Sequence, residues 1–117
     1  MSDLKKIQIL LAEDTQTDAE ATLRALQEVG LAANVVWVKD GQEVLDYIFC
    51  TGPFAGRQGG VPTLIMLDLK MPRVNGLDVL KILKTTELTK FIPIIMLTSS
   101  AEEPDITYCY EYGVNSY

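Results

Sequence analysis

The chain has 117 residues, of which 48% are hydrophobic and 22% are charged, proportions typical of one globular domain and unlike those of disordered or fibrous chains. Its 16 acidic and 10 basic residues give a formal net charge of −6, which argues against direct binding of nucleic acid or of an anionic membrane. The absence of histidine excludes a histidine-dependent catalytic pair, a histidine-ligated metal and a phosphohistidine within this chain.

The cysteines and the N-terminal sequence bear on where the protein works. Cys50 and Cys109 are far apart and form no CxxC motif, so neither a zinc site nor a thioredoxin-type motif is indicated and we expect reduced thiols. The first apolar run stops at Glu13 and Asp14, too early for the core of a signal peptide, and no run is long enough to cross a bilayer. These features predict a cytoplasmic location.

The first half of the chain predicts two strands and two helices in alternation. Residues 7–12 and 35–38 are short, nearly continuous apolar runs, typical of strands buried on both faces. Between them, apolar side chains recur at helical spacing up to Gly30, a typical C-terminal cap. Asp40, with Glu43 three residues later, predicts the capped start of a second helix. The expected inward residues are Ala19, Leu23, Leu26 and Val29 in the first helix, and Val44, Leu45 and Ile48 in the second.

Residues 50–62 form the one long irregular segment, rich in glycine and proline. Its Gly59-Gly60 pair precedes a predicted strand, whereas a phosphate-binding loop follows a strand and opens a helix. We therefore expect a flexible connector.

The second half continues the alternation. Apolar runs at 63–67 and 92–97 predict two more strands, and Asn75 is the expected N-cap of a helix between them. A further helix is expected over residues 100–113, and a fifth strand from Val114. The inward residues of the helix after Asn75 are expected to be Leu77, Leu80 and Leu83. Because parallel strands need long crossovers, the alternation predicts an α/β fold with a doubly wound parallel sheet and helices on both faces.

Polar residues suited to metal or phosphate chemistry follow three of the four apolar runs. Glu13 and Asp14 follow the first, Asp68 the third, and Thr98 with Ser99 the fourth. The carboxyl ends of parallel strands meet at one sheet edge, where open α/β sheets bind ligands, so Asp14 and Asp68 face each other if the first and third strands are neighbours. Taken singly, each residue can instead be a helix cap or a polar strand end. Their joint occurrence favours a site.

Carboxylates gathered in one cleft repel each other, by about 4 kcal/mol for two unit charges ~4 Å apart at an effective dielectric constant of roughly 20. Protonation of one acid relieves the repulsion, but Mg²⁺, which takes oxygen ligands, is the more productive answer. Glu13 and Asp14 are then expected as ligands, directly or through water, and Asp68 as a ligand whose second oxygen attacks a phosphoryl group to form an aspartyl-phosphate. The Thr98 hydroxyl is expected to donate to a phosphate oxygen.

Four segments together form a pattern that is typical of one protein family. They are Glu13-Asp14, residues 68–72 (DLKMP) with Gly76 beyond them, Thr98-Ser99, and residues 112–117 (YGVNSY). In this combination, which covers essentially the whole chain, the sequence resembles the receiver domain of two-component response regulators. The long loop and the two chain segments at 49–52 and 113–117 further resemble the small stand-alone regulators that partner bacterial phytochromes and related sensor histidine kinases.

The resemblance implies a flavodoxin-like, CheY-like fold with strand order 2-1-3-4-5. It implies that Asp68 accepts a phosphoryl group from a phosphohistidine of a sensor histidine kinase, a phytochrome-type kinase included. The Mg²⁺ ligands that it implies are Glu13, Asp14, Asp68 and the backbone carbonyl of Lys70, with Mn²⁺ or Ca²⁺ able to substitute. The protein would be a phosphoacceptor rather than an enzyme, assisting its own phosphotransfer and dephosphorylation.

The resemblance also implies a switch. The hydroxyl of Thr98 would move toward the phosphoryl group and the ring of Tyr117 would rotate inward, reshaping the face made by the fourth helix and fifth strand.

The chain departs from the family at its end. Receivers carry a lysine and a fifth helix after the aromatic that matches Tyr117, and this sequence stops there. We therefore expect a single receiver domain over residues 1–117 that is C-terminally incomplete. An uncovered sheet face exposes apolar surface, which predicts association into a homodimer.

Three other functions compete with this interpretation. A haloacid-dehalogenase-type hydrolase also uses an aspartate and Mg²⁺, but its DxD pattern is not matched by Asp68-Leu69-Lys70. A flavin or nucleotide binder would meet an acidic turn at residues 13–17, which repels phosphate. A phosphorylation-independent interaction module is disfavoured by the retained acids and Thr98, although the missing lysine leaves it open.

The remaining aromatic residues are expected to pack or to face a partner rather than to bind a ligand. Trp37, on the presumed edge strand, is expected to be a packing or partner-face residue, and the tyrosines at 108, 110 and 112 are expected to form a partner face.

Overall fold

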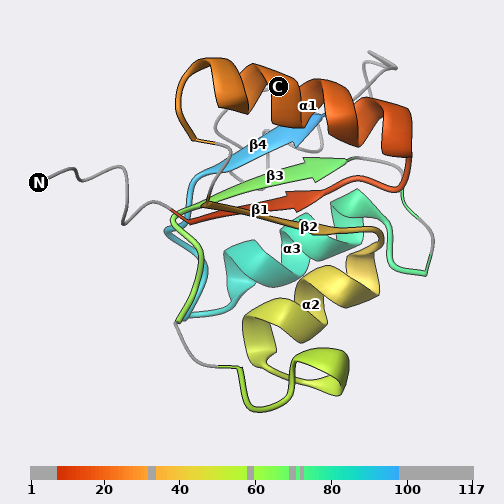
Figure 1. Cartoon of the computed structure of the whole chain (residues 1–117). Helices are drawn as coiled ribbons and strands as arrows, with labels where there is room; N and C mark the ends of the chain where they lie inside the picture. Colours follow the sequence, from red (N-terminus) through yellow and green to blue (C-terminus); the bar gives the residue numbers. More distant parts are fainter. Residues whose placement is uncertain (1–7, 32–33, 58–59, 69–70, 72, 98–117) are drawn as a thin grey trace, which may run out of the picture.

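The computed structural model describes residues 8–31, 34–57, 60–68, 71 and 73–97. Its four strands form one parallel sheet in the order β2-β1-β3-β4 (Figure 1). The elements in chain order are β1 (Ile9–Ala12), α1 (Gln16–Glu28), β2 (Val35–Val38), α2 (Gly41–Phe49), the 3-10 helix η3 (Gly52–Phe54), β3 (Leu64–Asp68), α3 (Gly76–Thr85) and β4 (Ile94–Leu97). The doubly wound, CheY-like sheet is confirmed as far as its fourth strand, and the helix expected at 100–113 and the strand from Val114 lie outside the described residues.

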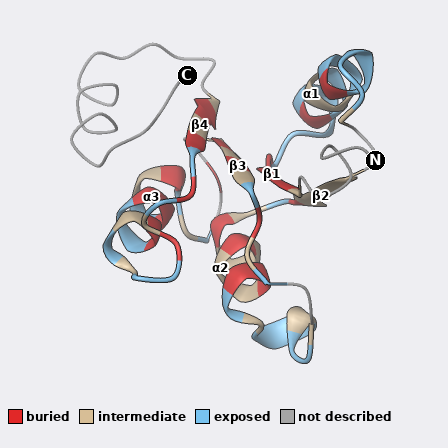
Figure 2. Cartoon of the chain, turned by 90° about the vertical axis from the view of Figure 1, so that its left-hand side faces the viewer, coloured by how far each residue is buried: buried red, intermediate tan, exposed pale blue. Residues whose placement is uncertain are grey.

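Helices cover both faces of the sheet, as predicted. Helix α1 lies on one face, and α2 and α3 lie on the other (Figure 1). Figure 2 shows the buried residues concentrated on the strands and on the sides of α2 and α3 that face them, while α1 is largely exposed. The main core therefore lies between the sheet and the α2–α3 layer. Its fully buried members are Leu10, Ala12, Val44, Ile65, Leu67, Val79, Leu80, Leu83, Ile94 and Met96.

Each large apolar side chain buried in this core contributes about 1.5–3 kcal/mol relative to its exposed state. The predicted inward residues of α2 and α3 are buried or half-buried. In α1, Ala19 and Leu26 are buried, but the prediction for Val29 was wrong because its side chain is 63% exposed. The helix ends before Val29, and Gly30, at φ +81°, reverses the chain so that the Leu31 N–H donates to the Leu26 carbonyl.

Side-chain caps begin α2 and α3 where the sequence predicts them. The Asp40 carboxylate accepts the backbone N–H of Glu43 at 2.8 Å, and the Asn75 side chain accepts that of Asp78 at 2.9 Å. The Glu43 carboxylate in turn accepts the Lys39 N–H at 2.7 Å, one residue before the position that a regular capping box would use. Both helices are thereby fixed at the ends that lie nearest the carboxyl edge of the sheet.

The described part of the segment after α2, for which the sequence predicts a flexible connector, is folded onto that helix. The Phe54 ring packs edge-on against Tyr47, with ring centroids 5.1 Å apart. The Arg57 guanidinium lies 3.9 Å from the centroid of the Tyr47 ring, and its Nε donates to the Tyr47 carbonyl at 2.9 Å. An edge-on aromatic contact, a cation–π contact and a side-chain hydrogen bond to the Tyr47 carbonyl thus hold this part of the segment against α2.

Candidate functional site

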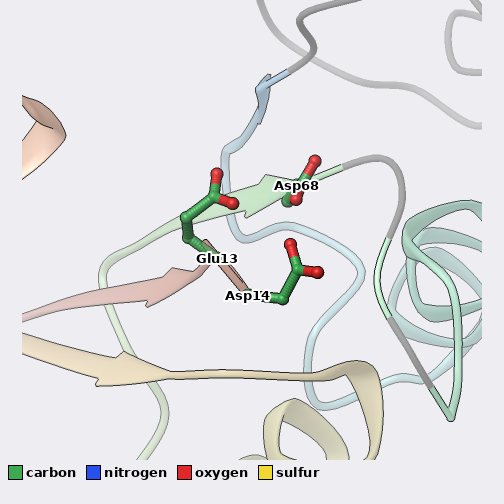
Figure 3. A group of neighbouring side chains, drawn as sticks. All are labelled: Glu13, Asp14 and Asp68. Atoms are coloured by element: carbon green, nitrogen blue, oxygen red, sulfur yellow. The ribbon is translucent and has the colours of Figure 1, made fainter. Parts of the chain in front are cut away.

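Three carboxylates gather at the carboxyl edge of the sheet. Glu13 and Asp14 directly follow β1, and Asp68 is the last residue of β3 (Figure 3). One oxygen from each side chain lies within 4.8 Å of the other two. The strand register explains this: Ala12 pairs with Leu67, so the next residues along the two strands, Glu13 and Asp68, are neighbours. The structure therefore brings together the three acids that the sequence places at the site.

Glu13 is held rigidly at the base of the cluster. Only 5% of the residue is exposed. Its backbone N–H donates to the Val38 carbonyl at 3.1 Å, its own carbonyl accepts the Trp37 indole N–H at 2.8 Å, and its carboxylate accepts the Thr15 N–H at 3.1 Å. These three bonds fix both the main chain and the side chain of Glu13.

The electrostatics of the cluster disfavour the ionised form of Glu13. Burial raises the pKa of its carboxyl above the usual value, and the negative charges of Asp18 and Asp14 add to the rise, while hydrogen bonds with the Thr15 N–H and the Asp68 side chain oppose it. A proton or a cation therefore stabilises this arrangement. The side-chain atoms that the three acids offer to a metal are all hard carboxylate oxygens, the ligand type that divalent ions such as Mg²⁺ and Mn²⁺ take in proteins. The acidic cluster fits a divalent metal.

The three acids differ in solvent exposure, so that part of the cluster is open to a ligand and part is buried. Asp14 is exposed, Asp68 is half-buried and Glu13 is buried. Helix α1 has Thr15 as its N-cap residue, so Asp14 is not the helix cap that it would be in a purely structural role. A ligand entering from solvent meets Asp14 and Asp68, with Glu13 beneath them.

Other predicted site residues lie outside the described residues. These are Lys70, Thr98, Ser99 and Tyr117. Their expected roles stay predictions.

Two features near the site escaped the sequence analysis. Trp37 was expected to pack or to face a partner, yet its indole N–H also holds the Glu13 carbonyl. Arg73, at φ +65° in the loop after β3, forms hydrogen bonds of 3.0 Å from Nε and Nη2 to the two oxygens of Asp40. Neither the target of an edge-strand indole nor a pairing across 33 residues leaves a local pattern in the sequence.

Comparisons with known proteins agree with the geometry. Residues 9–117 match the family described as the response regulator receiver domain. The probable methanogenesis regulatory protein FilR2 of Methanothrix harundinacea is 35% identical over 109 residues, which are 93% of this chain and 68% of that protein. Response regulator Rcp1 of Synechocystis sp. is 31% identical over 109 residues, which are 93% of this chain and 73% of that protein.

Solved structures of similar proteins have the same fold. The bacteriophytochrome response regulator RtBRR is 47% identical with a TM-score of 0.86, over 95% of this chain and 67% of that one. The phosphorylated cyanobacterial phytochrome response regulator RcpA is 35% identical with a TM-score of 0.85, over 95% of this chain and 78% of that one. The Mn²⁺-bound form of Rcp1 is 29% identical with a TM-score of 0.84, over 95% of this chain and 78% of that one.

Within the described part of the chain, no helix has the length and apolarity needed to cross a membrane. The sheet order, the acidic cluster at its carboxyl edge and the match over residues 9–117 lead to one assignment. The chain belongs to the response regulator receiver domain family of two-component systems.

Proposed function

We propose that this chain accepts a phosphoryl group on Asp68 from the phosphohistidine of a sensor histidine kinase, in a reaction that depends on Mg²⁺. The observation that carries the proposal is the convergence of Glu13, Asp14 and Asp68, with one oxygen of each within 4.8 Å of the others. The phosphorylated state of RcpA and the Mn²⁺-bound state of Rcp1, both similar in fold to this chain, support it.

In the proposed transfer, a carboxylate oxygen of Asp68 attacks the phosphorus of the phosphohistidine. The new P–O bond forms as the P–N bond breaks, and the electron pair of the broken bond stays on the imidazole nitrogen. When bound, Mg²⁺ supplies positive charge that offsets the negative phosphoryl oxygens. Glu13, Asp14 and Asp68 would hold the ion. Glu13 is buried and makes three hydrogen bonds, so it would keep the ligand set in place without rearrangement.

Dephosphorylation is part of the same proposal. A water oxygen attacks the phosphorus, the P–O bond to Asp68 breaks, and inorganic phosphate leaves with the carboxylate restored. In this scheme the chain assists both steps on its own side chain. The predicted ligand carbonyl of Lys70, the phosphate contact of Thr98 and the switch ring of Tyr117 complete the scheme as expectations from the sequence.

We further propose a phytochrome-type kinase as the donor and a single receiver domain over residues 1–117. The 47% identity to the bacteriophytochrome response regulator RtBRR supports the first, and the family match over 9–117 supports the second. A homodimer stays a prediction that light scattering would test. A phosphorylation-independent module is not favoured, because such a protein has no need for three converging carboxylates.

The test is phosphorylation followed by intact mass. We expect the chain, incubated with Mg²⁺ and acetyl phosphate, to gain one phosphoryl group that hydroxylamine removes. Asp68→Asn and an EDTA control should gain none, whereas Asp78→Asn, which changes an exposed aspartate at the start of α3, should behave as wild type. A second arm replaces acetyl phosphate with a phosphorylated bacteriophytochrome kinase. Absence of the adduct in both arms, with Mg²⁺ bound, would overturn the proposal.

A further inference from the structure

The side chain of Trp37 reaches the acidic site from the edge strand. Its indole N–H donates to the Glu13 carbonyl at 2.8 Å. Trp37 pairs with Leu11 in the register of β2 and β1, and Leu10 and Ala12 on either side of Leu11 face the core under α2 and α3. Because side chains alternate along a strand, Leu11 and Trp37 lie on the face that α1 covers. The ring therefore lies beside β1 at its carboxyl end.

The indole supplies a hydrogen bond that the strand ladder does not. Strand β2 holds the Glu13 N–H through the Val38 carbonyl at 3.1 Å, but it ends at Val38, and α2 begins at Gly41. The Glu13 carbonyl is thus beyond the end of the paired strand, and the Trp37 N–H bonds it there. This carbonyl belongs to the planar peptide that joins Glu13 to Asp14. A hydrogen bond that fixes the Glu13 carbonyl therefore also sets the orientation of the main chain from which the Asp14 side chain projects.

The position of the ring is itself supported. Trp37 is half-buried, and the Lys39 ammonium lies 5.4 Å from the ring centroid, within the range of a cation–π contact. Lys39 also donates its backbone N–H to Glu43, at 2.7 Å. The indole is therefore held by the Glu13 carbonyl at its N–H and flanked by the Lys39 ammonium at its ring.

We propose that Trp37 is a positioning residue for the divalent cation at the acidic cluster. The inference deepens the proposed function and rests on it: the indole N–H holds the Glu13–Asp14 peptide so that both carboxylates reach one ion together with Asp68. Hydrogen-bonding partners behind metal ligands commonly tune affinity in this way. In this role Trp37 would act through the Glu13–Asp14 peptide and would not itself be a ligand of the ion.

The experiment compares Mg²⁺ binding by calorimetry in three chains. Trp37→Phe keeps the aromatic bulk and removes the N–H, and Val35→Ala, another half-buried change on the same face of the same edge strand, is the matched control. We expect Trp37→Phe to raise the dissociation constant for Mg²⁺ about threefold to tenfold, the effect of one hydrogen bond. Val35→Ala should bind as wild type, and thermal unfolding of both variants in EDTA verifies that they fold.

A second readout needs no change at position 37. Trp37 is the only tryptophan, so a ¹⁵N-labelled chain has one indole N–H resonance. We expect Mg²⁺ to shift that resonance in wild type with the midpoint seen by calorimetry, and to leave it in place in Asp14→Asn.

The outcomes separate the two proposals. Wild type that fails to bind Mg²⁺ overturns the metal site of the proposed function, and the role of Trp37 with it. Wild-type binding with an equal affinity in Trp37→Phe overturns the positioning role alone. Should Trp37→Phe not fold, an indole resonance that stays unmoved at saturating Mg²⁺ overturns it instead.

Discussion

Arg73 and Asp40 join the loop after β3 to the start of α2 by two parallel hydrogen bonds. Nε and Nη2 of the guanidinium each lie 3.0 Å from one oxygen of the carboxylate. The same carboxylate caps α2 through the Glu43 N–H. The Asp40 side chain thus ties the loop that follows β3 to α2, a helix on the core side of the sheet.

The ion pair makes the stability of the protein depend on pH in the acid range. Burial alone would raise the pKa of Asp40, but hydrogen bonds from Arg73 and from backbone N–H groups, with the charge of Arg73, lower it on balance. A carboxyl with a lowered pKa stabilises the fold above its unfolded value of about 3.9, and that contribution is lost as the pH falls through the folded value.

We expect Arg73→Ala to lower the melting temperature at pH 7 by about 1–4 °C, since the pair is partly exposed. The difference from wild type should shrink as the pH falls through the lowered pKa of Asp40, because the carboxyl is then protonated in both chains. Glu87→Gln, which breaks the exposed pair with Lys90, should leave the melting temperature unchanged at both pH values. A difference between Arg73→Ala and wild type that persists undiminished in acid would contradict this account.

Gly41 allows α2 and the loop after β3 to touch. A Cβ placed on Gly41 would lie 1.8 Å from the Val74 carbonyl oxygen, so backbone must move to admit any side chain. We expect Gly41→Ala to destabilise the protein by about 3 kcal/mol, measured by urea unfolding.

The control for this substitution is Gly56→Ala. Gly56 has φ +84°, and no atom of the described residues lies within 4 Å of an added Cβ, so its replacement tests backbone strain without a clash. It should cost only about 1–2 kcal/mol. Equal losses of unfolding free energy in the two variants would show that close packing at Gly41 is not the cause of the destabilisation.

The segment after α2 should depend on Arg57 for its conformation. The guanidinium stacks on Tyr47 and donates from Nη1 to the Gly60 carbonyl at 2.9 Å, while its Nη2 is buried with no hydrogen-bonding partner among the described residues. We expect Arg57→Ala to cost about 1–2 kcal/mol and to speed proteolytic cleavage between residues 50 and 62. Mg²⁺ binding at the far edge of the sheet should not change, and a loss of binding would mean that the segment is coupled to the site.

The sequence predicted those features that local chemistry determines. The strands follow from their apolar runs, and the starts of α2 and α3 follow from Asp40 and Asn75. The approach of Asp14 to Asp68 also needs the first and third strands to be neighbours, an order that the family resemblance implied and the structure confirms. The features that it missed depend on partners distant in the chain. Neither the Trp37 bond to Glu13 nor the stacking of Arg57 on Tyr47 has a spacing that reveals it, and Val29 is exposed because its helix ends one residue earlier than its periodicity suggests.

Removal of the Glu13 charge should separate stability from metal binding. The raised pKa of Glu13, caused chiefly by burial and by neighbouring acids, means that its ionised form costs stability at neutral pH. Glu13→Gln removes that cost, so we expect a higher melting temperature than wild type in EDTA. Mg²⁺ should raise the melting temperature of wild type, because a ligand that binds only the folded state stabilises it, and should raise that of Glu13→Gln much less. Glu20→Gln, an isosteric change of an exposed acid on α1, should match wild type in both conditions. A variant Glu13→Gln that is less stable than wild type in EDTA, yet gains as much from Mg²⁺, would show that Glu13 serves the fold rather than the ion.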